Sequence, residues 1–523
     1  MNEADSHQKP DLVVRGDDLT ETARELALIM AKSDHLYNRS GPVKVIIQPG
    51  SALPEVRPMS VDRVVVEAHE LVRPVKLQSP PKPVTLPDRV AKLYLALDDW
   101  GLPPLKGITT APLLSADGSI RVAQGYDPTI GMWCCNVPKT EVPDAPTLAD
   151  ARAALLMLRA AFCTFPFADA ETTRGPDDVV PLVNRSSSPG QDESTFLTGL
   201  LTAVCRPSLP LAPGLLINAP LVSGAGTGKG LLVRAICEIA FGYQPYALHS
   251  CGSSAEFEKR IGAALIEAAP VLFLDNVNDA ALRGDLLASV LTEPSVKVRQ
   301  LGFSRLLPFN PMAFVAVTGN GVMLSEDLVR RFIVAELDAR TDDPENRPFP
   351  PGYLASISAC RAELLSAALT IWRWGRQNES AIPCGRPLGS YETWGRWVRD
   401  PLLALGCADP VKRIAQIKAR DPLRQRNAVL FKKWWECHGN QPVSAAELHE
   451  EVQRQIDPHG RGRQFIAVAL TRLTGTRAAG FVLTRQEPVG KWGHATYALE
   501  AVGPGDPDAP YDPDAMDVSG NEF

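Results

Sequence analysis

Residues Leu215–Ile239 read LLINAPLVSGAGTGKGLLVRAICEI, and this stretch determines the fold of the central part of the chain. The apolar run at 215–222 predicts a buried strand, and the apolar residues after Lys229 recur at helical spacing. Between them lies a loop with three glycines at alternate positions, directly before Lys229. Glycines let backbone N–H groups turn toward phosphate oxygens, which the lysine and the helix N-terminus also attract. The stretch therefore predicts a strand, loop and helix that bind a nucleotide triphosphate.

The loop departs twice from the motif GxxxxGK[ST], because Ser223 takes the place of the first glycine and Gly230 that of the Ser or Thr. A hydroxyl at the latter position normally holds Mg²⁺, so we expect phosphate binding to survive these changes better than metal binding. An ordinary glycine turn would not explain three alternating glycines followed by a lysine. The predicted phosphate-binding residues are Ser223, Gly224, Ala225, Gly226, Thr227, Gly228, Lys229 and Gly230.

Composition indicates a globular chain of three or four domains, with 523 residues of which 45% are apolar. The net charge is −6, and the segment 501–523 alone holds six acids and no Lys or Arg. The remainder is therefore balanced, and any contact with DNA must come from local basic patches.

The sequence shows no apolar run of about 18 residues and starts with polar and acidic residues, so we expect no membrane partner, no signal peptide and a cytoplasmic protein. Its ten cysteines are scattered without a CxxC pair. This pattern favours reduced, mostly buried thiols over a structural zinc or a disulfide framework.

Residues 1–170 are predicted to form an α+β domain, followed by a linker at 171–191 that is rich in turn formers and charge. Asp117 and Asp127 lie in turn-like contexts and are interpreted as turn residues rather than metal ligands. The elements expected are helices at 18–33, 61–72, 86–99 and 147–162 and a strand at 43–48.

The segment VLFLDNVND at 271–279 predicts a buried strand that ends in Asp275. A carboxylate at the carboxyl end of such a strand is placed to hold Mg²⁺. The next residue, Asn276, can orient a water molecule but cannot take its proton. Asp279 and Glu293 are both candidates for that role, and the sequence does not choose between them.

Three further segments between residues 296 and 331 carry candidate functional residues. Residues 296–309 predict a β-hairpin that carries Lys297, Arg299 and Arg305, with a simple solvated hairpin as an equal alternative. Residues 312–321 predict a strand ending in Thr318 and Asn320. A short helix capped by Ser325 then leads to Arg330 and Arg331, which are either surface ion-pair partners or a charge delivered to a neighbouring subunit.

The phosphate loop, LDN, hairpin, TGN and RRF, in this order, resemble the AAA+ ATPases of helicase superfamily 3, and most closely the helicase portions of phage, plasmid and integrated-element primase-helicases. The resemblance covers about residues 192–340 and implies an AAA+ P-loop ATPase core, for which we predict a domain at 192–345. It implies that Lys229 contacts the phosphates of ATP, that Asp275 holds Mg²⁺ and that Asn320 is the polar sensor. Arg330 or Arg331 would then act in trans. Asn276 would follow the metal ligand, at a position where many such ATPases carry a Glu that polarises the attacking water. Gly230 and Asn276 therefore both depart from the common pattern.

The same resemblance implies a homo-oligomeric ring, commonly a hexamer, whose hairpins face single-stranded or forked DNA in a central pore. The stretch LYNRSGPVKVI at 36–46 is similar to the segment that joins primase and helicase parts in such proteins. No primase active site is evident, so we expect the helicase part alone, with a separate primase or initiator as a partner.

After the ATPase core, residues 346–410 predict a helical region whose tryptophans pack in its core, and 411–500 show the helix and strand order of a winged helix. Such a domain binds DNA or docks a protein. Its candidate DNA-binding residues are Arg461, Arg463, Arg472, Arg485 and Lys491. Residues 501–523 are predicted to be a disordered acidic tail.

The expected fold class is therefore α/β, with an AAA+ core between an N-terminal α+β region and a C-terminal helical and winged-helix region. The expected function is an ATP-dependent DNA helicase or translocase that serves replication of a mobile element. Two alternatives remain open. One is a switch that binds ATP and assembles on DNA but hydrolyses poorly, and the other is a loader or remodeller with a protein partner.

Overall fold

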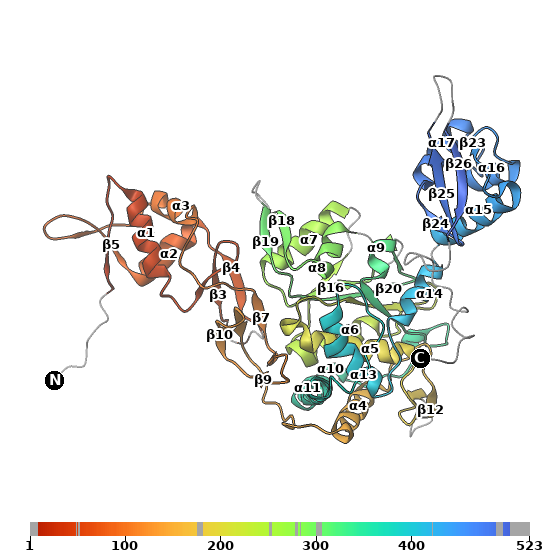
Figure 1. Ribbon diagram of the computed structural model, residues 1–523. Coiled ribbons are helices and arrows are strands. Elements are labelled where there is room, and N and C mark those ends of the chain that lie inside the picture. The colour runs from red at the N-terminus through yellow and green to blue at the C-terminus, as the bar shows by residue number, and fades with distance from the viewer. Residues whose placement is uncertain are drawn as a thin grey trace. The chain divides into compact units, whose positions relative to one another are not determined.

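Figure 1 shows the computed structural model. The chain forms two compact units, Met1–Val411 and Lys412–Phe523, each held together by contacts among its own residues. The structure describes residues 9–48, 50, 53–174, 181–249, 254–277, 281–282, 284–299, 306–420, 422–487 and 495–502. The interpretations of Asp279, Arg305, Lys491 and the tail after residue 502 fall outside these ranges. The division at 411 lies where the winged-helix region is predicted to begin, and the finer domain boundaries stay predictions.

The first part of unit 1 is a small α+β assembly built around a helical core (Figure 1). Asp18 accepts a hydrogen bond from the backbone N–H of Glu21 and so caps α1, as its position before the apolar pattern predicts. Two three-stranded sheets, in the orders β1-β5-β6 and β2-β3-β4, flank the helices. The elements are β1 Asp11–Val13, α1 Leu19–Met30, β2 Leu36–Asn38, β3 Pro42–Ile46, β4 Glu55–Pro58, α2 Val61–Leu71, β5 Arg73–Lys76, β6 Lys82–Pro83 and α3 Asp88–Leu95.

Short strands and turns follow, as the glycine and proline pattern predicts. Asp117 accepts hydrogen bonds from Ser119, and Asp127 accepts one from the backbone N–H of Thr129, so both are turn residues. The strands are β7 Gly107–Thr109, β8 Leu113–Leu114, β9 Ile120–Arg121, β10 Gly125–Asp127 and β11 Met132–Cys134.

Arg39 ties this N-terminal part to the core of unit 1. Its guanidinium donates to the backbone carbonyls of Leu105 and Leu265, at 3.2 and 2.7 Å, and lies 5.2 Å from the ring centre of Phe309. Burial lowers the pKa of Arg39 to about 10, and the carbonyl acceptors compensate for the lost hydration.

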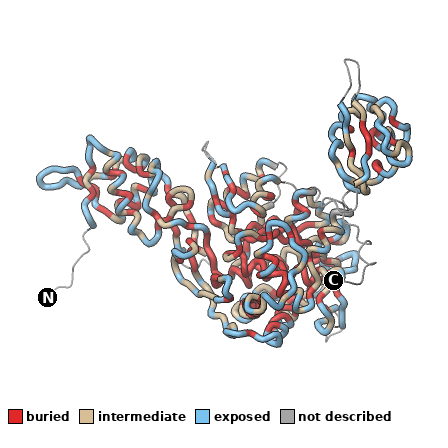
Figure 2. The backbone as a smooth tube through the Cα atoms, in the orientation of Figure 1, coloured by how far each residue is buried: buried red, intermediate tan, exposed pale blue. Residues whose placement is uncertain are grey.

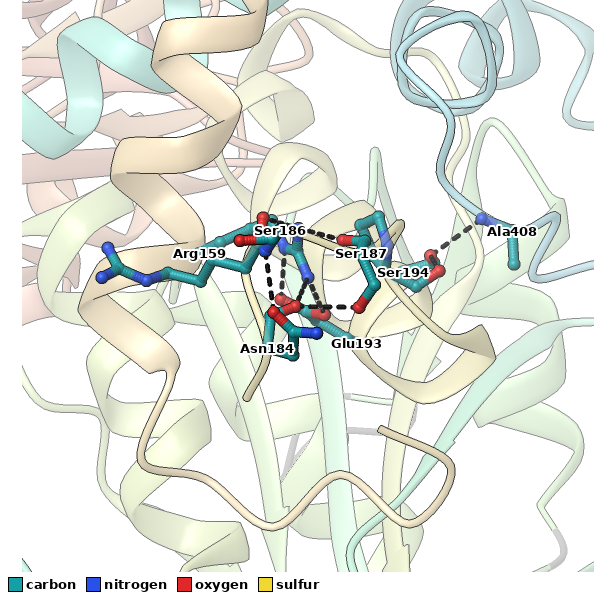
Figure 3. A network of polar contacts seen from close by, with 9 residues as sticks. Arg159, Asn184, Ser186, Ser187, Glu193, Ser194 and Ala408 are labelled. Atoms are coloured by element: carbon teal, nitrogen blue, oxygen red, sulfur yellow. Dashed lines mark hydrogen bonds and ion pairs between the residues drawn. The ribbon is translucent and has the colours of Figure 1, made fainter. Parts of the chain in front are cut away.

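A buried ion pair joins α4 (Leu148–Phe162) to α5 (Gln191–Cys205), and Figure 3 shows it from close by. Arg159 binds both carboxylate oxygens of Glu193, at 2.7 and 2.9 Å, with each side chain at most 4% exposed. The same guanidinium donates to the carbonyls of Asn184, Arg185 and Ser187. The segment predicted as a linker thus contains a hydrogen-bonded loop, besides a pair of strands, β12 Thr172–Arg174 and β13 Pro181–Val183.

The centre of unit 1 is a five-stranded, fully parallel sheet in the order β15-β16-β20-β14-β22. Apart from the edge strand at 247–249, its strands are almost continuously buried, which explains their uninterrupted apolar sequences. They are β14 Gly214–Ala219, β15 Ala247–His249, β16 Val271–Asp275, β20 Phe314–Asn320 and β22 Phe332–Glu336. A mixed α/β fold with a parallel sheet is therefore confirmed.

Helices α5 and α6 pack against β14 and each other, and α11 packs outside them on α4, α5 and α6. Every residue of α5 from Asp192 to Cys205 is buried, because the helix lies between the sheet and α11 (Figure 2). The remaining core elements are α6 Lys229–Phe241, α7 Ser254–Ile266, β17 Ala281–Leu282, α8 Asp285–Thr292, β18 Val296–Arg299, β19 Leu306–Phe309, β21 Met323–Leu324 and α9 Glu326–Val329.

The helices after the sheet confirm the packing role predicted for the tryptophans. Trp372 and Trp394 are fully buried, Trp374 and Trp397 are 7% exposed, and the indole N–H of Trp394 donates to Thr202 on α5 at 2.8 Å. The helices are α10 Tyr353–Ala359, α11 Arg361–Gln377, α12 Glu392–Trp394 and α13 Asp400–Ala404, with a π-helical turn at Gly395–Arg399.

Unit 2 contains helices followed by a hairpin, in the predicted order, around a core that includes Phe431, Trp434 and Leu470. The stretch SAAELHEEVQRQ at 444–455 predicts a helix over its whole length. The helix begins only at Glu450, because Val443–Ser444 pairs with Thr496–Tyr497 as a strand and His449 caps the helix. The elements are α14 Lys412–Arg420, α15 Pro422–His438, β23 Val443–Ser444, α16 Glu450–Ile456, α17 Arg463–Leu473, β24 Arg477–Ala478, β25 Phe481–Gln486 and β26 Thr496–Ala501.

Among the described residues, no single helix is long and apolar enough to cross a membrane, and only α10 and α11 together, across a 67° bend, meet that test. The nine described cysteines are free thiols, of which four are buried.

Arg159→Ala should lower the free energy of unfolding of unit 1 by about 3–5 kcal/mol, because it leaves Glu193 charged and buried without its partner. Urea unfolding measures this change. Lys259→Ala, which removes an exposed ion pair with Glu256 in the same unit, is the control and should change it by less than about 0.5 kcal/mol. Equal effects of the two substitutions would contradict a structural role for the buried pair.

Candidate functional site

The phosphate loop, Asp275 and Asn320 meet at one edge of the sheet, because β14, β16 and β20 are parallel and end there. Strand β20 lies between the other two, with Asn320 level with Ala219 and Val317 level with Leu274. The chain continues from β14 toward β15 on one side, whereas β22 lies on the other side of β14. The strand order thus reverses direction at β14, and open parallel sheets bind ligands at such a point.

The loop after β14 turns tightly on its glycines. Gly226 and Gly228 adopt left-handed conformations, with φ of 75° and 94°. A Cβ at Gly224 would lie 2.1 Å from the carbonyl oxygen of Pro220 and 2.7 Å from Oδ1 of Asn320, so only glycine fits. Ser223 is also left-handed, with φ of 63°, which is the physical reason for a glycine at that position in the common motif.

Lys229 begins α6 and turns back into the loop. Its Nζ donates to the carbonyl of Gly224 at 2.6 Å and to Oγ1 of Thr227 at 3.2 Å. Burial lowers the pKa of Lys229 to about 8, and the nearby Asp275 opposes that change. The ammonium group is thus only partly stabilised by the loop, and an anion placed there would stabilise it further.

The N-terminus of α6 has no side-chain cap, because Gly228 occupies the capping position. Its first backbone N–H groups therefore point toward the loop with the positive end of the helix dipole. Together with Lys229, this geometry suits an anion such as a phosphate.

Thr318 on β20 forms hydrogen bonds to the polar residues at the end of β16. Its hydroxyl donates to Oδ1 of Asp275 and accepts a hydrogen bond from the backbone N–H of Asn276 at 3.1 Å. Asn320 lies further along β20, with its amide against Gly224 of the loop. The strand order therefore brings Asp275, Thr318 and Asn320 to the phosphate loop.

The residues around Asp275 do not fit Mg²⁺ bound in the way that the resemblance implies. Gly230 offers no hydroxyl beside Asp275, where the common motif has a Ser or Thr. The guanidinium of Arg234 lies there instead, with Nη2 3.6 Å from Oδ2 of Asp275. A metal role for Asp275 stays a prediction that this donor set does not support.

Asn276 has a left-handed backbone, with φ of 59°, and is exposed at the end of β16. Asn adopts this conformation more readily than Glu does, so the departure from the common pattern follows from the local backbone. Of the two candidates for the missing carboxylate, Glu293 is exposed just after α8 and Asp279 lies outside the described residues.

The two arginines before β22 differ in exposure. Arg330 is 61% exposed and Arg331 only 12%, and both pair with Asp327. They precede β22, which runs parallel to β14 with Gly214 paired to Phe332. The arginines therefore lie at the amino-terminal edge of the sheet, opposite the phosphate loop of the same chain.

The basic residues expected to contact DNA are on the surface. In β18 the residues alternate, with Val296 and Val298 buried and Lys297 and Arg299 exposed. In unit 2 the exposed candidates are Arg461, Arg463, Arg472 and Arg485. Arg461 stacks 4.7 Å from the ring centre of Phe465, and Arg485 pairs with Glu487 at 3.4 Å.

The sequence interpretation missed Arg234 as a functional residue and gave Thr318 no role. A signal for Arg234 was present, since it lies one helical turn after the glycine that replaces the usual hydroxyl. Its pairing with Asp275 depends on the tertiary structure, because the two residues come from different elements.

No protein-family model and no curated protein matches the chain. Among solved structures, the chain is similar to the apo C-terminal region of NrS-1, with a TM-score of 0.32 and 14% identity over 65% of this chain and 85% of that one. It is also similar to JCV helicase, with a TM-score of 0.21 and 14% identity over 53% of this chain and 61% of that one. At these TM-scores the likeness does not define the function, which is therefore inferred from the residues of this chain.

Asn276→Ala should be less stable than Asn276→Gly by about 1 kcal/mol, since both remove the amide but only glycine adopts the left-handed backbone without strain. Thermal unfolding of the two variants measures the difference. Equal midpoints would mean that the backbone at residue 276 is not constrained to this conformation.

Proposed function

We propose that this protein is an ATP-driven DNA translocase or helicase that works as a ring of identical subunits, with an AAA+ core of the superfamily 3 type. The observation that carries the proposal is the meeting of the phosphate loop, Lys229, Asp275 and Asn320 at one edge of a parallel sheet. Nucleotide-dependent changes at that edge could reach the DNA through elements attached to the same strands.

The triphosphate would bind in the loop between Ser223 and Gly230. Its oxygens would accept hydrogen bonds from the loop N–H groups and replace the Gly224 carbonyl as the partner of Lys229. The N-terminal end of α6 adds a favourable dipole. Asn320, at the end of the neighbouring strand, would then sense whether the γ-phosphate is present.

The position of the exposed arginine supports a ring. Arg330 lies at the sheet edge opposite its own phosphate loop, so it would act on the nucleotide of a neighbouring subunit. Arg331 is mostly buried, and its backbone carbonyl accepts a hydrogen bond from Gly214, which favours a structural role. Of the two, we therefore assign Arg330 as the residue that acts in trans.

The hairpin β18–β19 is the proposed DNA contact of the core. It packs through Val298 against Gly262 of α7 and presents Lys297 and Arg299 to solvent. Its strands lie in the chain between the strand that ends at Asp275 and the strand that ends at Asn320, so it can move with both. Unit 2, proposed as a winged helix, would add phosphate contacts through Arg461, Arg463, Arg472 and Arg485.

The biological setting follows from the sequence resemblance alone. It favours replication of a phage, plasmid or integrated element, with a separate primase or initiator as a partner. Single-stranded or forked DNA is the proposed substrate.

A second candidate function is a switch that binds ATP and assembles on DNA with little turnover. The observations that favour it are Asn276 in place of a proton acceptor and Gly230 in place of a hydroxyl. Under this alternative, the nucleotide controls assembly rather than movement. Stimulation of ATP turnover by single-stranded DNA distinguishes the two.

ATP binding should weaken as the pH rises above about 8, because the Lys229 ammonium loses its proton in the free protein while bound phosphates favour the charged form. The loss should not exceed tenfold per pH unit, and calorimetric titration from pH 7 to 9.5 measures it. Lys229→Arg keeps its charge and should show a flat profile, whereas Lys229→Ala should bind weakly at every pH. Wild-type affinity in Lys229→Ala would refute the nucleotide site.

Replacing both Lys297 and Arg299 by Ala should abolish stimulation of ATP turnover by single-stranded DNA and unwinding of forked duplexes, while basal turnover persists. The substitutions remove up to two phosphate contacts per subunit, so the salt dependence of DNA binding should fall as well. Lys259→Ala on α7 is the matched exposed control. If the double variant unwinds DNA at the wild-type rate, the hairpin is not the DNA contact of the core. If single-stranded DNA does not stimulate ATP turnover by the wild type, the result favours the ATP-binding switch.

A further inference from the structure

Gly230 and Arg234 lie one turn apart on the same face of α6, near its N-terminus. Long side chains on a helix lean back toward its N-terminus, so Arg234 extends over Gly230. Its Nη1 lies only 2.8 Å from the position that a Cβ on residue 230 would occupy. The absence of a side chain at Gly230 therefore makes room for the guanidinium.

Two groups on β16 hold the guanidinium in this place. Its Nη2 is 3.6 Å from Oδ2 of Asp275, and its Cζ is 5.1 Å from the ring centre of Phe273. Phe273 and Asp275 are two residues apart and so project from the same face of the strand. An ion pair and a cation–π contact thus fix one cation from two sides.

The same place is where a hydroxyl at residue 230 and a metal ion would be expected. A Cβ at residue 230 would lie 3.4 and 3.6 Å from the two carboxylate oxygens of Asp275. Arg234 and Asp275 remain 30% and 23% exposed, so the pair is accessible to a ligand in the loop. A hydroxyl side chain at 230 and the observed guanidinium position exclude each other sterically.

We propose that Arg234 supplies the positive charge that a divalent cation would otherwise bring, so that this chain binds the triphosphate of its nucleotide without a metal ion. The inference rests on the proposed nucleotide site. Arginine suits the task because it stays charged and carries five N–H donors, some of which can bind Asp275 while others bind phosphate oxygens. Lys229 and Arg234 together place two cations beside one carboxylate, which leaves a positive charge for the polyanion.

The test is calorimetric titration of ATP into the full chain, once with excess Mg²⁺ and once with EDTA. The wild-type dissociation constant should differ by less than about threefold between the two conditions. Arg234→Gln keeps much of the length but removes the charge, and it should weaken binding in EDTA by at least about tenfold. Lys259→Gln, on the exposed face of α7, is the matched control and should bind as the wild type does.

Gly230→Thr gives a second, independent variant, because its Cβ displaces the guanidinium while Arg234 itself is kept. It should weaken binding in EDTA. Combined with Arg234→Ala, which clears the space, it should restore a hydroxyl beside Asp275 and make ATP binding dependent on Mg²⁺ by at least about tenfold.

The outcomes separate this inference from the nucleotide site on which it rests. If the wild type loses tenfold or more in EDTA and Arg234→Gln binds normally, the inference is wrong, while loss of binding in Lys229→Ala still supports the site. If the wild type binds ATP in neither condition, both are wrong. Should Arg234→Gln fail to fold by circular dichroism, the wild-type comparison and Gly230→Thr decide the question.

Discussion

Parallel alignment of β14, β16 and β20 is the constraint on which the candidate site depends. Since the three strands run in one direction and β20 separates the other two, their carboxyl ends deliver the phosphate loop, Asp275 and Asn320 to one edge. The buried α5 and the Arg159–Glu193 pair hold that sheet against the outer helices. Loss of this alignment would scatter residues that lie up to about a hundred positions apart in the chain.

The charges at this edge are arranged around a single carboxylate. Asp275 accepts from Thr318, pairs with Arg234 and opposes the fall in the pKa of Lys229 that burial causes. Two buried or half-buried cations beside one anion are costly without a further anion. This imbalance, together with the uncapped helix N-terminus, makes the edge better suited to a triphosphate than to a free metal ion.

Departures from the common motif have local physical causes in this structure. Asn276 and Ser223 both adopt left-handed backbones, where an Asn is tolerated and a glycine is the usual choice. Gly230 is compensated by a neighbour on its own helix, Arg234, which fills the space that a hydroxyl would take. The pair Arg330 and Arg331, equivalent in sequence, is divided by burial into one exposed and one enclosed residue.

The sequence by itself determined the elements of the core and the composition of the phosphate loop. Apolar periodicity, Asp18 as a helix cap and the alternating hairpin strand are local signals, and the structure confirms them. The sequence pattern predicted the start of α16 wrongly, because the pairing of Val443–Ser444 with β26 overrides the local helix preference. Only the tertiary structure decided the partner of Arg234, the exposure of Arg330 and the sheet order, because each depends on contacts between segments whose separation in the chain carries no pattern. Side-chain charge can be read from a sequence, but the atom that balances it cannot.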